Sequence, residues 1–285
     1  MRRFDRNDLP FNNLMKDHWL NDGCIIVENF YTDKECDKLK NNANKLVKNF
    51  DPDSVKTIFD TKKQEHIDDS YFLESGDKIR FFFEDKAFDK NGNLANKKEL
   101  VINKIGHALH DLDDVFYKFS HRKDLDQISK AIDIENPLLI QSMYIFKQPN
   151  IGGEVVCHQD STFLYTNPDS VVGFWIALED ATIENGCLWI DRGGHKGPLR
   201  KLFTRSNGTM KMTVLDKTPF AKTTTPLEVK KGTLILLHGR LPHYSKENLS
   251  SKSRHAYTLH VIDGNKKYPK ENWLQRPNLE LKGFI

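Results

Sequence analysis

Apolar residues recur with helical spacing in the first half of the chain. Asp33 can cap a helix, and apolar residues then return at every third or fourth position up to Phe50. The same spacing predicts a second helix over residues 99–119 and a short third helix over residues 125–132. We therefore expect residues 1–136 to form a mostly helical buttress.

The pattern changes after Pro137, where short apolar runs bounded by Gly, Pro, Asn and Asp replace the helical spacing. These runs cover residues 138–146, 171–178, 187–190, 227–229, 233–237 and 256–262. Short strands separated by turn residues predict an antiparallel β-sandwich or barrel. We expect one mainly β domain over residues 1–285, with N-terminal helices packed on one sheet of a core at 137–263 and a C-terminal extension at 264–285.

Composition and charge narrow the class of protein. The chain has 285 residues and a net charge of +3, so nothing favours nucleic-acid or membrane binding. Four widely spaced cysteines without a CxxC motif indicate a reducing compartment rather than disulfides. The chain shows no secretory signal, no peroxisomal tail and no apolar run near the roughly 20 residues that span a bilayer. We expect a cytoplasmic monomer.

A long basic segment, residues 196–225, separates two of the predicted strands. It carries seven Lys or Arg and one acid, Asp216. One interpretation is a solvated loop, and the other is a cover over an acidic or phosphorylated substrate, because long loops inside a domain are often functional.

The chemistry that the sequence suggests begins at His158-Gln159-Asp160. An apolar run leads into it, and side chains two apart on a strand point the same way, so His158 and Asp160 would project together while Gln159 points away and tolerates substitution better. Two histidines and one carboxylate on one face of iron(II) leave positions open for oxygen ligands. A second His-x-Asp, at residues 66–68, lies in a polar stretch and is interpreted as a surface loop.

A third ligand is predicted at His243, beyond the apolar run 233–237. Arg254 follows it by eleven residues, at the start of the next strand, and we expect these two strands to form a hairpin. A guanidinium near iron can hold the far carboxylate of a dicarboxylate cosubstrate in bidentate fashion, and Ser245 can add a hydrogen bond.

With these residues the chain resembles the phytanoyl-CoA dioxygenase family of iron(II)/2-oxoglutarate oxygenases. The stretches that carry the resemblance are "NKIGHALHDLDDVF", "QSMYIFKQPNIGGEVVCHQDSTFLYT", "GFWIALEDATIENGCLWIDRGGH", "GTLILLHGRLPHYS" and "RHAYTLHVID". The resemblance implies a double-stranded β-helix (a cupin-like jelly roll), Fe(II) as the metal, and 2-oxoglutarate and O₂ as cosubstrates.

The resemblance also implies roles for particular residues. The iron ligands would be His158, Asp160 and His243. The residues around 2-oxoglutarate would be Arg254 and Ser245 at its far carboxylate, Met143 and Trp175 along the pocket, and Lys104 reaching in from the second predicted helix.

The implied reaction is hydroxylation of a small-molecule C–H bond, with conversion of 2-oxoglutarate and O₂ to succinate and CO₂. A carboxylate at Asp160 favours hydroxylation or demethylation over halogenation.

The chain departs from the family pattern at Asp191–His195, where the family usually has Pro-Gly-Ser-His at the active-site mouth, so substrate contacts there are expected to differ. The family name points to an acyl-CoA-like substrate and the basic segment to a phosphorylated one. Two alternatives stay open: a catalytically inactive jelly-roll binding or scaffold protein, and a non-oxidative cupin-like metalloenzyme.

Overall fold

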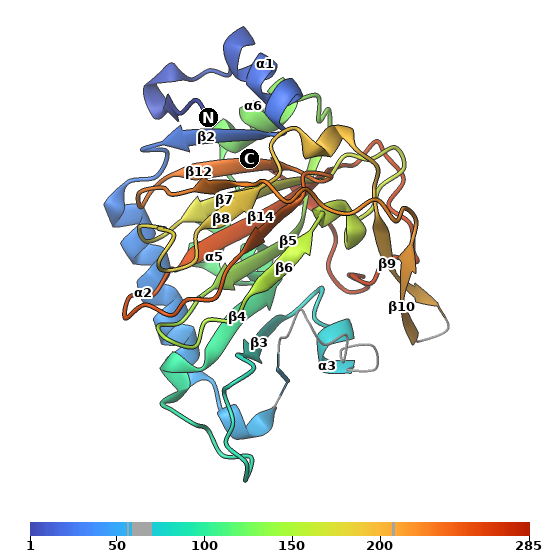
Figure 1. Ribbon diagram of the computed structural model, residues 1–285. Helices are drawn as coiled ribbons and strands as arrows, with labels where there is room; N and C mark the ends of the chain where they lie inside the picture. The colour runs from blue at the N-terminus through green and yellow to red at the C-terminus, as the bar shows by residue number, and fades with distance from the viewer. Residues whose placement is uncertain (56, 59–69, 207–208) are drawn as a thin grey trace.

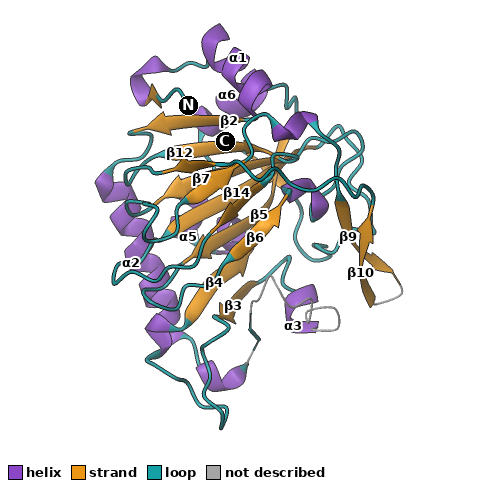
Figure 2. Cartoon of the chain, viewed as in Figure 1, coloured by secondary structure: helices purple, strands orange, loops and turns teal. Residues whose placement is uncertain are grey.

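Two β-sheets face each other at the centre of the molecule, and helices cover the outer face of the larger sheet (Figures 1 and 2). The computed structural model describes residues 1–55, 57–58, 70–206 and 209–285. Within these ranges the larger sheet has nine strands, in the order β1 (Phe4–Asp5), β2 (Cys24–Glu28), β12 (Leu234–His238), β7 (Val172–Ala177), β14 (Ala256–Asp263), β5 (Pro137–Ile145), β4 (Ile102–His107) and β3 (Ile79–Phe83), with β15 (Lys282–Gly283) also paired to β5. The smaller sheet has the order β11 (Thr225–Leu227), β8 (Leu188–Ile190), β13 (His243–Ser245) and β6 (Val155–His158).

The larger sheet is buried on both faces, which explains why its strands read as continuous apolar runs. In β7, Phe174 and Ile176 pack toward the helices, whereas Trp175 and Ala177 pack toward the smaller sheet. This alternation follows from the two-residue period of a strand. The six strands expected after Pro137 are confirmed as β5, β7, β8, β11, β12 and β14, although β11 ends where its prediction began.

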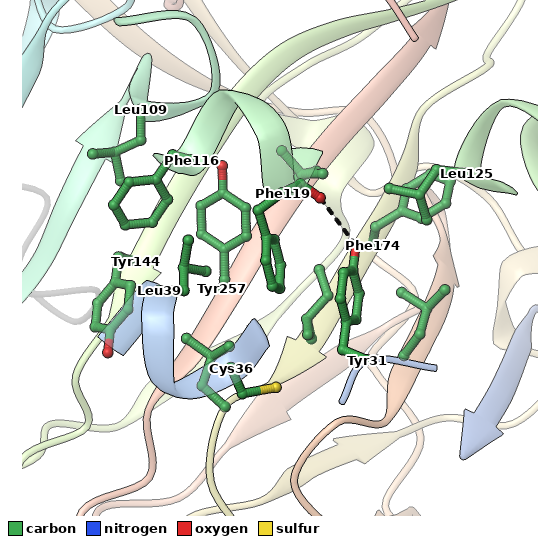
Figure 3. Packing of buried hydrophobic residues seen from close by; sticks show 14 of the residues in the cluster. Tyr31, Cys36, Leu39, Leu109, Phe116, Phe119, Leu125, Tyr144, Phe174 and Tyr257 are labelled. Carbon is green, nitrogen blue, oxygen red and sulfur yellow. Dashed lines mark hydrogen bonds between the residues drawn. The ribbon is translucent and has the colours of Figure 1, made fainter. Parts of the chain in front are cut away.

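Helices pack on the outer face of the larger sheet. They are α1 (Asn13–Asp22), α2 (Asp33–Asn49), α4 (Leu109–Leu112), α5 (Asp114–Ser120) and α6 (Lys123–Ala131). The short helix α3 (Ser70–Leu73) lies on the other face, where Phe72 and Leu73 pack with Phe82. The helices predicted to start at Asp33 and near Leu125 are confirmed as α2 and α6, but Thr32 rather than Asp33 caps α2, in a capping box with Glu35. Figure 3 shows part of this core, where the rings of Tyr31 and Phe119 stack at 4.1 Å.

The single helix predicted over 99–119 is wrong. Residues 102–107 form strand β4, which pairs with β3 and β5, and the helical part begins at α4 and α5. Ile102 and Ile105 are three positions apart, which fits one face of a helix, but both are buried in the strand. The carboxylate of Asp113 accepts hydrogen bonds from the backbone amides of Val115 and Phe116, so this residue caps the start of α5.

The basic segment 196–225 is not a loop throughout. It contains β9 (Lys201–Ser206) and β10 (Thr209–Val214), which pair antiparallel and project from the side of the molecule opposite α2 (Figure 1). Phe203 of β9 contacts Phe163, with 5.7 Å between ring centroids. Within the described residues, no helix has the length and apolar character needed to cross a membrane.

Candidate active site

Two histidines and an aspartate meet between the two sheets. His158 ends β6 and His243 begins β13, and the two residues are direct partners in the register of these strands. Cross-strand partners have Cβ atoms about 4.5–5.5 Å apart, and here the ring centroids are 4.3 Å apart. Gln159 is extended and Asp160 begins the short 3-10 helix η5 (Asp160–Thr162). One ligand atom from each of the three side chains lies within 4.8 Å of the other two.

Hydrogen bonds fix which ring nitrogen of each histidine faces the centre. Nδ1 of His158 lies 2.8 Å from the carbonyl oxygen of Val156, and Nδ1 of His243 lies 3.0 Å from that of Leu241. A carbonyl only accepts, so each Nδ1 carries the hydrogen and each Nε2 presents a lone pair. Both Nε2 atoms lie 3.6 Å from Oδ1 of Asp160. Neighbouring ligands of a six-coordinate ion with bonds of about 2.0–2.1 Å are about 3 Å apart, so this set fits a divalent metal such as Fe(II).

The protonation states also suit metal binding. Burial lowers the pKa of His243 to about 4, so its ring is neutral near pH 7. Burial acts to raise the pKa of Asp160, but the neighbouring His243 and His260 outweigh it and hold this pKa well below its usual range. Neutral imidazole and ionised carboxylate are the forms that a metal requires.

The second oxygen of Asp160 is held from the larger sheet. Nε2 of His260, on β14, lies 3.4 Å from Oδ2, and Gly173 on β7 leaves room for this oxygen, because a Cβ there would lie 2.9 Å from it. With Oδ2 occupied by His260, Oδ1 faces the two histidine ligands. His260 therefore orients the carboxylate, as outer-shell partners of metal ligands commonly do.

Replacing His260 by leucine should lower the affinity for a divalent metal by about 10- to 100-fold, because Asp160 loses the partner that orients it. A calorimetric titration of the purified protein with Mn(II) measures this. His107→Leu is the matched control, because His107 lines the same cavity but bonds through Nδ1 to Ser75 Oγ at 2.7 Å. Equal metal affinity of the two variants would show that His260 has no orienting role.

Arg254 faces the same space from the larger sheet. Its side chain is 2% exposed, Nε donates to the carbonyl oxygen of Gly186 at 3.1 Å, and Nη1 is buried without a hydrogen-bond partner among the described residues. Its guanidinium lies 5.3 Å from the ring centroid of Trp175. Burial lowers the pKa of Arg254 to about 10, so it is charged near pH 7. A buried cation with a free donor is suited to receive an anionic group of a ligand.

The hairpin predicted between the apolar run 233–237 and the strand after Arg254 is wrong. That run is β12, which pairs with β2 and β7, whereas β14 pairs with β5 and β7, so β7 separates the two strands in the larger sheet. His243 itself lies on β13, which pairs with β6 and β8 in the smaller sheet. Residues 246–253 cross between the sheets, where Nδ2 of Asn248 donates to the carbonyl oxygens of Lys147 and Lys252. Arg254 is therefore opposite the metal ligands rather than beside His243 in one sheet.

One cavity of about 190 Å³ joins these features. All eight residues proposed from the sequence line it, namely Lys104, Met143, His158, Asp160, Trp175, His243, Ser245 and Arg254. Lys104 stands on strand β4 and not on a helix, and its Nζ lies 3.8 Å from Sδ of Met143. Burial holds the pKa of Lys104 well below its usual range.

The sequence interpretation missed several polar residues of the cavity, among them Lys147 and His260. Both lie at an even spacing from a recognised site residue, which is the spacing that marks one face of a strand: Lys147 lies four residues after Met143, and His260 lies six after Arg254. Extending the strand period from a recognised site residue would have found them.

Two other features of the sequence lie away from this cavity. Residues 191–195, where the chain departs from the family pattern, do not line it, and His195 instead contacts His238 with 5.0 Å between ring centroids. The expectation of altered substrate contacts at this loop stays a prediction. The second His-x-Asp, at residues 66–68, lies outside the described residues.

Gln159 points away from the metal ligands, as its strand position predicts, but it is not a spacer. It is 1% exposed; its Nε2 donates to the carbonyl oxygens of Pro198 and Arg240, and its Oε1 accepts from the amide of Arg200. These hydrogen bonds connect the end of β6 with residues 198–200, which precede β9.

Gln159→Ala should lower the free energy of unfolding by about 1–3 kcal/mol, because it leaves buried backbone groups without partners. Metal affinity should change little, since no ligand atom is removed. Urea denaturation and a Mn(II) titration on the same protein measure both quantities. A loss of metal binding as large as that of His158→Ala would mean that Gln159 faces the ligands after all.

Comparison with known proteins gives consistent matches. The family model described as Phytanoyl-CoA dioxygenase (PhyH) matches residues 19–256. The chain is 46% identical over 264 residues to "Phytanoyl-CoA dioxygenase" of Arabidopsis thaliana, covering 92% of this chain and 93% of that protein. It is 43% identical to "Phytanoyl-CoA dioxygenase domain-containing protein 1" of Danio rerio, covering 89% and 91% of the two chains.

The fold also matches solved structures. The crystal structure of EctD from S. alaskensis with bound Fe has a TM-score of 0.67 and 18% sequence identity, and the match covers 98% of this chain and 89% of that one. At this identity the likeness speaks for the fold alone. It confirms the prediction of a jelly-roll core with helices packed against it.

Proposed function

Because the chain belongs to the phytanoyl-CoA dioxygenase family, whose members are Fe(II)- and 2-oxoglutarate-dependent dioxygenases, we propose that its central cavity hydroxylates a C–H bond of a small molecule. One observation carries the proposal. Two histidine Nε2 atoms and one carboxylate oxygen converge in a cavity whose opposite wall holds a buried arginine with a free donor.

The residues of the chain would form two groups, one that binds the metal and one that binds the cosubstrate. His158, Asp160 and His243 would hold Fe(II), with both rings kept in the required tautomer by backbone carbonyls. Arg254 and Ser245 would hold the far carboxylate of 2-oxoglutarate. Bound iron, 2-oxoglutarate and O₂ supply the oxidising chemistry and yield succinate and CO₂, while the protein contributes orientation and the exclusion of water.

Along the rest of 2-oxoglutarate, three side chains of the larger sheet would form the pocket wall. Trp175 and Met143 would pack against the chain of the cosubstrate, and Lys104 would approach from β4. Their place in the cavity supports this assignment, which the family resemblance suggested first.

We propose that the reacting group of the primary substrate is apolar. Aromatic side chains line the cavity beside the metal ligands, among them Phe163 and the stacked pair Phe72 and Trp273, whose ring centroids are 4.4 Å apart. Among the described residues of the basic hairpin formed by β9 and β10, none lines the cavity, but Phe203 supports the wall at Phe163. An acyl-CoA-like or phosphorylated substrate would therefore keep its charged part outside the cavity, toward this hairpin.

The two competing functions make different demands on the site. An inactive scaffold has no need for a buried guanidinium without a carboxylate partner opposite an intact ligand set, because such a charge is destabilising without a bound anion. A non-oxidative metalloenzyme would need the metal ligands but not Arg254. We further propose that the chain acts as one domain, as a monomer, in the cytoplasm.

Succinate formation from 2-oxoglutarate tests the proposal. Purified protein with added Fe(II) under O₂ should release succinate, and a screen of metabolite pools should identify the substrate as the compound that accelerates this release. If the wild-type protein neither binds 2-oxoglutarate nor converts it to succinate, the proposed function fails.

A further inference from the structure

A second buried cation lies beside Arg254. Lys147 follows the end of β5, is 2% exposed and lines the cavity. Its Nζ donates to Ser245 Oγ at 2.8 Å and to the carbonyl oxygen of Gly153 at 2.6 Å. Both of these partners are neutral, so neither balances the charge of the ammonium group.

One glycine positions both cations. The carbonyl oxygen of Gly186 accepts from Nε of Arg254, and a Cβ at Gly186 would lie 2.7 Å from Cε of Lys147. The two side chains therefore pack against the same residue and converge on the wall that carries Ser245. Gly186 has φ +85°, a conformation that favours glycine and keeps this close approach available.

The hydrogen bond from Lys147 also determines what Ser245 can do. An ammonium group only donates, so Ser245 Oγ is the acceptor in this contact. The hydroxyl hydrogen of Ser245 is then free to donate to another acceptor. In the cavity next to Arg254, that acceptor would be a carboxylate of the ligand.

The charges around Lys147 come from four elements. Arg254 before β14 opposes the ammonium, whereas Glu84 after β3, Glu154 before β6 and Glu247 after β13 favour it. Burial, followed by the charge of Arg254, lowers the pKa of Lys147 to about 7. Glu84 is itself bound by Asn103 and the amide of Gly153, and burial raises its pKa. A dianionic ligand would supply the negative charge that favours protonated Lys147.

We propose that Lys147 is a cosubstrate-binding residue that completes the far-carboxylate site of 2-oxoglutarate with Arg254 and Ser245, and that it takes up a proton when 2-oxoglutarate binds. The inference rests on the proposed function. It adds a residue that selects a dicarboxylate and makes cosubstrate affinity depend on pH.

The test compares two ligands that differ only at the far end. 2-Oxopentanoate has the keto-acid end and chain length of 2-oxoglutarate but a methyl group in place of the far carboxylate. With Mn(II) in the metal site, Lys147→Met should weaken 2-oxoglutarate binding by about 10- to 100-fold, as expected for a lost charged hydrogen bond. Its affinity for 2-oxopentanoate should stay within about twofold, while Lys147→Arg should retain most of the affinity for 2-oxoglutarate.

Proton uptake by the wild-type protein is a second measurement that needs no variant. At pH 8 a lysine with a pKa of about 7 is about nine-tenths neutral, so 2-oxoglutarate binding should take up close to one proton. Calorimetry in buffers of different ionisation enthalpy measures this number, and 2-oxopentanoate corrects for protons exchanged at the metal. At pH 6 the two ligands should cause the same proton uptake, since Lys147 is already charged. The affinity for 2-oxoglutarate should fall as pH rises above 7.

Two outcomes would overturn the inference while leaving the proposed function intact. The first is equal proton uptake with both ligands at pH 8. The second is a Lys147→Met variant that weakens both ligands equally, which would make Lys147 a purely structural residue. A wild-type protein that binds neither ligand would instead overturn the proposed function.

Discussion

Asp160→Ala should reduce succinate formation by on the order of 1000-fold, because the metal loses its only charged ligand in the proposed set and this stabilisation amounts to several kilocalories per mole. Metal affinity should fall with it. Asp160 is buried and its pKa lies well below the usual range, so the ionised ligand is present throughout the neutral pH range. Mn(II) titration and succinate release with Fe(II) measure the two effects.

The chain provides its own control for this experiment. Asp68→Ala alters the other His-x-Asp sequence, which the polar context predicts to be a surface loop. Succinate formation by this variant should equal that of the wild type. Metal-dependent turnover that survives Asp160→Ala, or that is lost with Asp68→Ala, would contradict the assignment of the ligands.

Arg254→Met should have opposite effects on binding and on stability. Affinity for 2-oxoglutarate should fall by on the order of 100-fold or more, because a guanidinium forms strong paired hydrogen bonds with a carboxylate. The ligand-free protein should be unchanged or more stable by about 1–4 kcal/mol, because a buried charge without a carboxylate partner is replaced by an apolar side chain of similar length. Binding calorimetry and urea denaturation without ligand measure the two effects.

Arg276→Met is the matched control, since Arg276 is a buried arginine whose guanidinium contacts the carboxylate of Asp111. Removing it leaves Asp111 with weaker compensation in a buried site, so stability should fall by about 3–5 kcal/mol. Affinity for 2-oxoglutarate should not change, since Arg276 does not line the cavity. Similar stability losses in both variants would mean that Arg254 is a structural residue without a binding role.

The sequence predicted the chemistry of the site better than its architecture. The short-range motif at His158 and the order of His243 and Arg254 are local patterns, and the side chains do meet in one cavity. The neighbours that a strand takes within a sheet depend on contacts between distant segments, which is why the expected hairpin was wrong: β7 lies between β12 and β14. Lys104 shows the same limit, because a run of buried residues does not distinguish β4 from a helix.

The partners of the site residues were the least predictable part. Nothing near Gln159 in the sequence indicates that it binds backbone groups at residues 198, 200 and 240. The residues next to Lys147 in the sequence do not indicate either that its charge lies close to Arg254 in the fold. Such partners arise from the packing of the whole domain, and only the alternation along β5 and β14 gave a local sign of them.

Because the site is divided between the two sheets, bound ligands would hold the two sheets together. His158 and His243 belong to the smaller sheet, whereas Arg254 and the partner of Asp160, His260, belong to the larger one. Metal and cosubstrate together would bridge the layers, so sliding one sheet over the other would have to break the complex first. Loaded protein should therefore resist proteolysis and amide hydrogen exchange in both layers at once, since ligands that bind only the folded form stabilise it by mass action.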